Sequence, residues 1–154
     1  MKIANHSLSV VIAAGLFFQG ASITLAQNPP SLDDIHWYLT DSYCGFSRVD
    51  HTFNYNDPES WRYIFMTGFG NGTDGELGYA RLDGRLRELQ EVKRFREGSD
   101  EIIMYQTWDK NPYLVTISRA QTSKGTESTD YTGHILVERN GVGKATPFKG
   151  DCGA

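Results

Sequence analysis

Apolar and polar residues alternate along most of this chain in short stretches bounded by turn-forming residues. Such alternation is typical of half-buried β-strands, because successive side chains of a strand point to opposite faces. The dipeptides Asp83-Gly84 and Asn140-Gly141 predict tight hairpin turns between such stretches. We therefore expect a mainly β fold, a single small antiparallel meander that is closed as a barrel or folded as a sandwich. The predicted strands cover residues 61–69, 75–82, 101–108, 112–120, 130–139 and 142–148.

Residues 85–97 are the segment in which strand and helix signals conflict. They are good helix formers, with Leu86, Leu89 and Val92 at three-residue spacing. The Asp-Gly turn directly before them and their thin apolar stripe favour a strand instead. Strand and helix are both retained for 85–97, and the fold class is the same in either case.

A short helix is predicted near the N-terminus of the folded part. Ser31 is a good N-cap residue, and Asp33 and Asp34 are acidic residues of the kind that favour a first helical turn. The helix would run for about ten residues and end before Cys44.

The first 26 residues have the pattern of a secretory signal peptide. Lys2 is followed by an apolar run from Leu8 to Phe18, and Thr24-Leu25-Ala26 forms a small-residue cleavage site before Gln27. The apolar run has about 11 residues, whereas a membrane-spanning helix needs roughly 20, so no membrane span is expected. The sequence predicts a mature chain of residues 27–154.

Composition and charge narrow the classes of function. The chain has 154 residues, of which 39% are hydrophobic and 22% are charged, values typical of a folded globular domain. Its formal net charge is −4, and without Lys2 the balance is 14 basic to 19 acidic residues, a net of −5. Because no block of lysine or arginine occurs, we expect no nucleic-acid partner. Residues 27–154 are predicted to form a single exported, soluble β domain.

The only two cysteines, Cys44 and Cys152, lie near the two ends of the predicted mature chain. An even pair in an exported protein indicates a disulfide, which would tie the entry segment to the last strand. The alternative is a pair of buried free thiols. With the signal peptide, the disulfide predicts a periplasmic or secreted protein.

The sequence of the glycine-rich loop at residues 70–75 matches the G-x-G-x-x-G pattern of dinucleotide-binding motifs. In such a fold a helix follows the glycines, whereas a strand and a hairpin follow them here. Asn71, Asp74 and Glu76 carry oxygen atoms of the kind that bind Ca²⁺, but their spacing lacks the acidic positions of an EF-hand loop. The loop is predicted to be a plain turn, and no cofactor is expected.

The histidines of the predicted mature chain are His36, His51 and His134. They are too scattered for a transition-metal site, so no metal is expected. His134 lies on the polar side of a predicted strand and should face solvent. His51, beside Asp50 in a polar and aromatic segment, is the most plausible titrating group, and a surface histidine is the alternative.

Catalytic patterns are weak. The sequence contains no G-x-S-x-G motif, but two carboxylates from different strands can meet without leaving a local spacing. A small secreted hydrolase that uses paired carboxylates and His51 is therefore the alternative function. The acidic residues near predicted strand ends are Asp57, Glu59, Asp109 and Glu127, and no pair among them stands out.

Aromatic residues are concentrated between positions 37 and 63. In a small β domain such side chains fill the core, or they form a partly exposed platform that binds a small ligand or a partner protein. The favoured function is a non-catalytic binding or envelope-associated module. The candidate binding residues are Trp37, Tyr38, Phe53, Tyr55 and Trp61. No stretch resembles a known family closely enough to transfer functional residues.

Overall fold

The computed structural model describes residues 27–36, 42–68 and 77–153. Strands dominate this part of the chain, and one short 3₁₀ turn, η1 (Pro58–Ser60), lies between β2 and β3. The strands are β1 (Leu32–Asp33), β2 (Ser42–Arg48), β3 (Phe65–Gly68), β4 (Leu77–Leu82), β5 (Arg85–Glu97), β6 (Asp100–Gln106), β7 (Leu114–Lys124), β8 (Ser128–Arg139) and β9 (Val142–Gly153).

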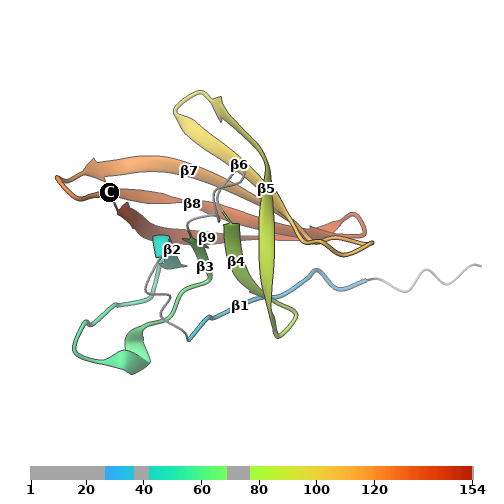
Figure 1. The fold of residues 1–154 in the computed structure, drawn as a ribbon, viewed down its shortest axis with the longest axis horizontal. Coiled ribbons are helices and arrows are strands. Elements are labelled where there is room, and N and C mark those ends of the chain that lie inside the picture. Colours follow the sequence, from blue (N-terminus) through green and yellow to red (C-terminus); the bar gives the residue numbers. More distant parts are fainter. Residues whose placement is uncertain (1–26, 37–41, 69–76, 154) are drawn as a thin grey trace, which may run out of the picture.

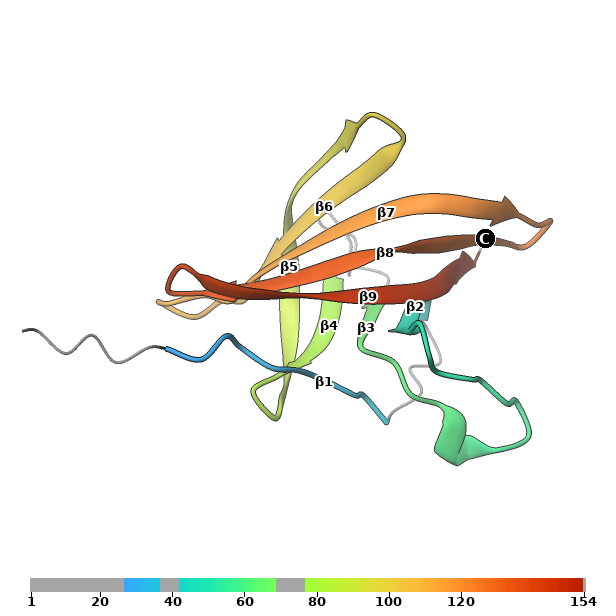
Figure 2. The same cartoon turned by 180° about the vertical axis from the view of Figure 1, so that it is seen from behind.

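Strands β2 to β9 form a closed antiparallel barrel of eight strands. Their order is β4-β3-β2-β9-β8-β7-β6-β5, and pairing between β4 and β5 closes the ring. The short β1 is an extra strand that pairs with the end of β4. Figures 1 and 2 show β7, β8 and β9 as long neighbouring strands along one side of the barrel. The predicted β meander is confirmed in its barrel form.

The two predicted hairpin turns are present. Asp83 and Gly84 have φ angles of 48° and 74°, and Asn140 and Gly141 have 54° and 76°. Two consecutive positive φ angles define the turn that matches the right-handed twist of a hairpin, and Asn-Gly and Asp-Gly adopt it most readily. These turns therefore fix the registers of β4 with β5 and of β8 with β9.

The predicted N-terminal helix is wrong over residues 31–36, where β1 is found instead. The capping residues make tertiary contacts. The Ser31 backbone N–H donates to Asp83 Oδ1 at 2.8 Å, and Asp33 Oδ2 accepts the Gly84 N–H at 2.8 Å. The carboxylate of Asp34 pairs with Arg48 at 3.1 Å. The helix prediction failed because these acids bind a hairpin and a strand, not a helical first turn. Residues 37–41 lie outside the described part.

Residues 85–97 are a strand, β5, and the helix alternative is wrong. The register of β5 against β6 shifts between Glu91 and Lys93, which marks a β-bulge. One extra residue in a bulge changes which face the following side chains take, so a simple alternation is lost. The predicted strand over 61–69 begins only at Phe65, because Tyr63 before it pairs with Ile35 in an isolated bridge and not with the barrel strands. Phe69 lies outside the described residues.

The barrel interior is apolar over most of its length. Buried aromatic and aliphatic side chains come from every barrel strand, and Phe46 and Phe148 stack at the centre with ring centroids 4.4 Å apart. Near the disulfide the interior is charged, because Arg119 follows Val115 and Ile117 on the inward face of β7.

Candidate functional site

A groove on the outside of the barrel is the main candidate cavity among the described residues. Its volume is about 750 Å³, and it is lined by residues of β2, β8 and β9, by Thr122 of β7 and by the segment between β2 and β3. This volume lies in the range of small-ligand sites in proteins, about 300–1,000 Å³. The groove has an aromatic side and an acidic side.

The aromatic side consists of Phe53, Tyr55 and Tyr63. Phe53 is 47% exposed and Tyr55 is 78% exposed. Both rings pack on Trp61, with centroid distances of 6.3 and 6.0 Å. The Tyr63 ring lies over Gly45, where a Cβ atom would come within 2.9 Å of it, so a side chain at this position would displace the ring. The absence of a side chain at Gly45 thus allows the ring to line the groove.

Hydrogen bonds hold the segment that carries these rings. The Ser60 hydroxyl lies 2.9 Å from the Asn54 carbonyl and 2.7 Å from the Asp57 carbonyl. Trp61 Nε1–H donates to the Asn54 carbonyl at 3.3 Å. His51 Nε2 lies 2.6 Å from the Ser60 carbonyl, so this nitrogen carries a proton and donates it. His51 therefore fixes the loop while its ring borders the groove.

The acidic side is a pair of aspartates on neighbouring strands. Asp130 of β8 and Asp151 of β9 are direct cross-strand partners, and both line the groove. Partial burial raises the pKa of Asp151, and the charge of Asp130 raises it further. The Ser123 hydroxyl donates a short hydrogen bond to Asp130. Among the described residues no lysine or arginine forms an ion pair with either aspartate, although Lys149 also borders the groove.

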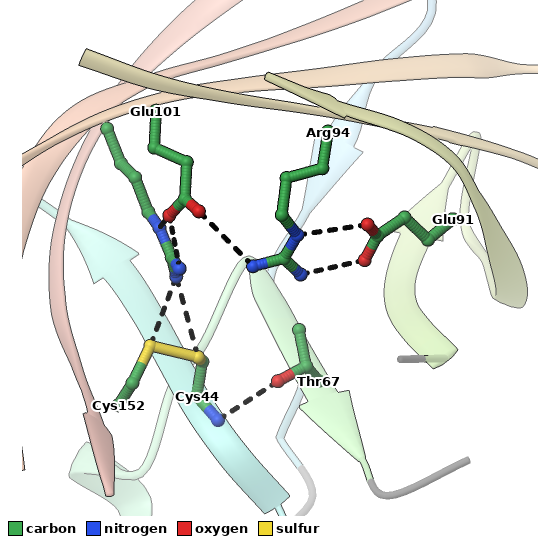
Figure 3. A network of polar contacts seen from close by, with 7 residues as sticks. Cys44, Thr67, Glu91, Arg94, Glu101 and Cys152 are labelled. Carbon is green, nitrogen blue, oxygen red and sulfur yellow. Dashed lines mark hydrogen bonds and ion pairs between the residues drawn. A yellow bond between two sulfur atoms is a disulfide. The ribbon is translucent and has the colours of Figure 1, made fainter. Parts of the chain in front are cut away.

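A second polar cluster extends from the buried Arg119 at the disulfide to the more exposed Arg94 (Figure 3). Arg94 donates two hydrogen bonds to the Glu91 carboxylate, at 2.9 and 2.7 Å. Its Nη1 atom lies 3.4 Å from Glu101 Oε1. Glu101 Oε2 accepts from Arg119 Nε and Nη2 at 2.7 and 2.6 Å. Arg119 Nη1–H donates to Cys152 Sγ at 3.2 Å. These charges bind one another, and we therefore interpret the cluster as structural.

The pKa of Glu101 follows from this environment. Burial alone would raise it, but the hydrogen bond and charge of Arg119, with the charge of Arg94, outweigh burial and hold the pKa below its usual value. Arg119 also lies over the Tyr131 ring, 4.3 Å from its centroid. The guanidinium is thus surrounded by a carboxylate, a ring and sulfur.

The predicted disulfide is confirmed: Cys44 and Cys152 are bonded, and they are direct partners in the β2–β9 pairing. The free-thiol alternative is wrong. An intramolecular disulfide is compatible with an extracellular location. In the described part of the chain no helix is long and apolar enough to cross a membrane.

The candidate binding residues fall into two groups. Phe53 and Tyr55 line the groove, and both rings pack on Trp61. Trp37 and Tyr38 lie outside the described residues, as do Asn71, Asp74, Glu76 and the rest of the glycine-rich loop.

The candidate catalytic and metal-binding residues are dispersed. The carboxylates predicted near strand ends lie in three separate connections: Asp57 and Glu59 before β3, Asp109 between β6 and β7, and Glu127 between β7 and β8. Asp109 is paired with Arg87 at 3.6 Å. His134 is exposed, as predicted, and so is His36. Within the described residues no three metal-binding side chains come together.

The Asp130–Asp151 pair was not singled out from the sequence, although a signal for it exists. The Asn140-Gly141 turn pairs Arg139 with Val142, and counting outward from that pair places Asp130 opposite Asp151. Comparison of the chain with protein-family models, with curated proteins and with solved structures finds no match in any of the three.

Proposed function

We propose that this protein is a non-catalytic binding module that takes its ligand in the groove. The observation that carries the proposal is the exposure of Phe53 and Tyr55 on a loop held by hydrogen bonds, at the edge of a cavity of about 750 Å³. Rings that are already fixed offer a large contact area at little further loss of conformational entropy. This is the arrangement expected of a surface that binds a small ligand or a partner protein.

We further propose that the module works outside the cytoplasm. The signal-peptide pattern of residues 1–26 and the Cys44–Cys152 disulfide support an exported domain of residues 27–154, periplasmic or secreted. An envelope-associated role agrees with both features.

Chemical-shift mapping of ¹⁵N-labelled protein against a mixed panel of neutral, anionic and cationic fragments tests the proposal. We expect shifts to concentrate on the backbone of residues 43–55 and 130–132. Tyr55→Ala should weaken the binding of the best fragment at least fivefold. The matched control is Trp108→Ala, since Trp108 is also exposed, at 67%, but does not line the groove. Shifts that fall elsewhere, or none at all, would exclude a binding function for the groove.

A hydrolase remains the second candidate, and one observation favours it: two carboxylates share the groove and the pKa of Asp151 is raised. Cross-strand partners have Cβ atoms about 4.5–5.5 Å apart, close to the carboxylate separation of retaining glycosidases. However, Asp130 and Asp151 project side by side from one sheet face, whereas catalytic carboxylates flank the bond they cleave. Turnover of chromogenic glycosides or esters that Asp151→Asn abolishes would support the hydrolase.

A further inference from the structure

We infer that the groove recognises an arginine side chain on a polypeptide partner, with the guanidinium between Asp130 and Asp151 and its plane against the aromatic side. This inference rests on the proposed function and specifies the chemistry of the ligand. Three features of the groove carry it: an unneutralised acid pair, an adjacent aromatic surface, and a floor longer than one side chain.

The acid pair is the first feature. Like charges directly opposite each other on neighbouring strands destabilise a sheet. Asp130 and Asp151 are such partners, and the charge of Asp130 adds to the effect of burial in raising the pKa of Asp151. Among the described residues no cation pairs with either one. A ligand cation between them would remove the repulsion and form charge-assisted hydrogen bonds.

The charged and titratable groups around the pair are consistent with a cationic ligand. Asp151 has Asp130 on one side and Gly45 of β2 on the other, so β2 brings no charge opposite it. Lys149 lies two residues along β9 and His51 lies on the loop, and both border the groove. Lys149 therefore opposes a cation from one end of the groove, and the guanidinium should occupy the end nearer the aspartates.

The aromatic side is the second feature. The face of an aromatic ring attracts cations, and arginine in particular stacks on tyrosine and phenylalanine while its edge donates to carboxylates. Tyr63 lies over Gly45, the residue that pairs with Asp151, so a ring lies next to the acid pair. A planar guanidinium can contact both surfaces at once, whereas an ammonium group has no flat face to stack.

The length of the floor is the third feature. Groove residues come from four neighbouring strands, Thr122 of β7, Asp130 of β8, Asp151 of β9 and Tyr43 of β2. At about 4.8 Å between strands the floor is roughly 14 Å long, the span of about four residues of extended chain. A free small cation would fill only part of the volume and would leave Phe53 and Tyr55 uncovered. A peptide with apolar neighbours beside its arginine would cover them.

Binding of peptide pools to the full mature protein tests the inference. The probe is a fluorescein-labelled pool with a central arginine and randomised apolar neighbours, and its match carries citrulline, which is neutral and has the same shape. We expect the arginine pool to bind at least tenfold more tightly than the citrulline pool, and more tightly than a lysine pool. Its affinity should fall as salt is raised.

Variants assign the effect to the groove. Asp151→Asn and Asp130→Asn should each weaken binding of the arginine pool at least fivefold, while Lys149→Gln should strengthen it. Glu97→Gln, the same change of charge on the exposed tip of the β5–β6 hairpin, should have no effect. A thermal melt of each variant confirms that it is folded, and the opposite sign expected for Lys149→Gln cannot arise from unfolding.

Three results would overturn the inference. The arginine and citrulline pools could bind equally, the arginine pool could fail to bind, or its affinity could be unchanged in both Asp151→Asn and Asp130→Asn. Binding of free arginine as tight as that of the pool would exclude a polypeptide ligand. If neutral fragments still shift the groove resonances, the binding function stands and only the cationic ligand is wrong. If no fragment or peptide does so, both proposals fail together.

Discussion

Replacing Glu101 by glutamine should destabilise the barrel strongly, because it leaves the guanidinium of Arg119 without its carboxylate. The Arg119 side chain is only 8% exposed, and Glu101 Oε2 accepts two of its N–H groups at 2.6 and 2.7 Å. Removing one partner of a buried ion pair costs about 3–5 kcal/mol. Glu101 is itself 21% exposed, and Arg119 keeps its contacts with Tyr131 and Cys152. Because of this partial exposure and these remaining contacts, we expect a loss at or below the lower limit of that range, about 2–3 kcal/mol.

This loss of unfolding free energy should lower the melting temperature by a measurable amount. Globular proteins unfold with an entropy of about 2.1 cal/mol/K per residue, so residues 27–154 give roughly 0.27 kcal/mol/K and a shift of about 10 °C. Differential scanning calorimetry at pH 7 measures it. Glu97→Gln, an exposed glutamate on the same hairpin, is the control and should shift the melting temperature by less than about 2 °C.

The same contact predicts how the shift depends on pH. The pKa of Glu101 is lower in the folded protein than in the unfolded chain, so its contribution to stability is complete above the unfolded value of about 4.3 and is lost as pH falls through the folded pKa. The difference between wild type and Glu101→Gln should therefore shrink at about pH 3. A difference below about 2 °C at pH 7, or an equal difference at both pH values, would refute the proposed role of the pair.

Other expectations follow from the covalent and backbone structure. Replacing both Cys44 and Cys152 by serine removes a link between residues that are 108 positions apart. On the chain-entropy model this costs about 4–5 kcal/mol of stability, so the melting temperature should fall by more than about 10 °C. Thiol titration of the unreduced protein should find no free sulfhydryl. Gly133→Ala would place a Cβ 1.9 Å from the Ser118 carbonyl oxygen and should abolish folding as judged by near-UV circular dichroism. Intact-mass analysis of exported protein should show a chain that begins at Gln27.

The barrel could be predicted from local patterns because its hairpins carry strong turn chemistry. Asp83-Gly84 and Asn140-Gly141 adopt the positive φ angles that only a few residues tolerate, so the sequence at these positions determines the turn. The N-terminal segment lacked such a constraint. Ser31, Asp33 and Asp34 satisfy the local rules for a helix start, and only the partners brought in by the fold, which lie far away in sequence, decide that they bind a hairpin.

The ambiguity of residues 85–97 also has a physical origin. A strand in a small barrel should place an apolar side chain inward at every second position, but β5 passes from the apolar core to the charged interior. Leu89 is buried in the core, whereas Glu91 and Arg94 belong to the polar cluster, and the bulge between Glu91 and Lys93 shifts the phase between them. Polar residues inside a barrel and a phase shift together remove the alternation on which a prediction depends.

The charged interior bears on where a ligand can bind. A barrel of eight strands has room either for packed side chains or for one small ligand. Here Phe46 and Phe148 stack in the core, and the ion-paired Arg119 occupies the part of the interior next to Cys44–Cys152.

The Cys44–Cys152 disulfide joins β2 to β9 on the inner face of the barrel. The neighbouring residues on the two strands, Gly45 and Asp151, face the groove outside. Because alternate residues of one strand point to opposite faces, the bond that closes the interior also fixes the register of the groove floor. An outer wall with a fixed register can hold an acid pair beside an aromatic surface, and this supports the proposal that recognition occurs on the outside of the barrel.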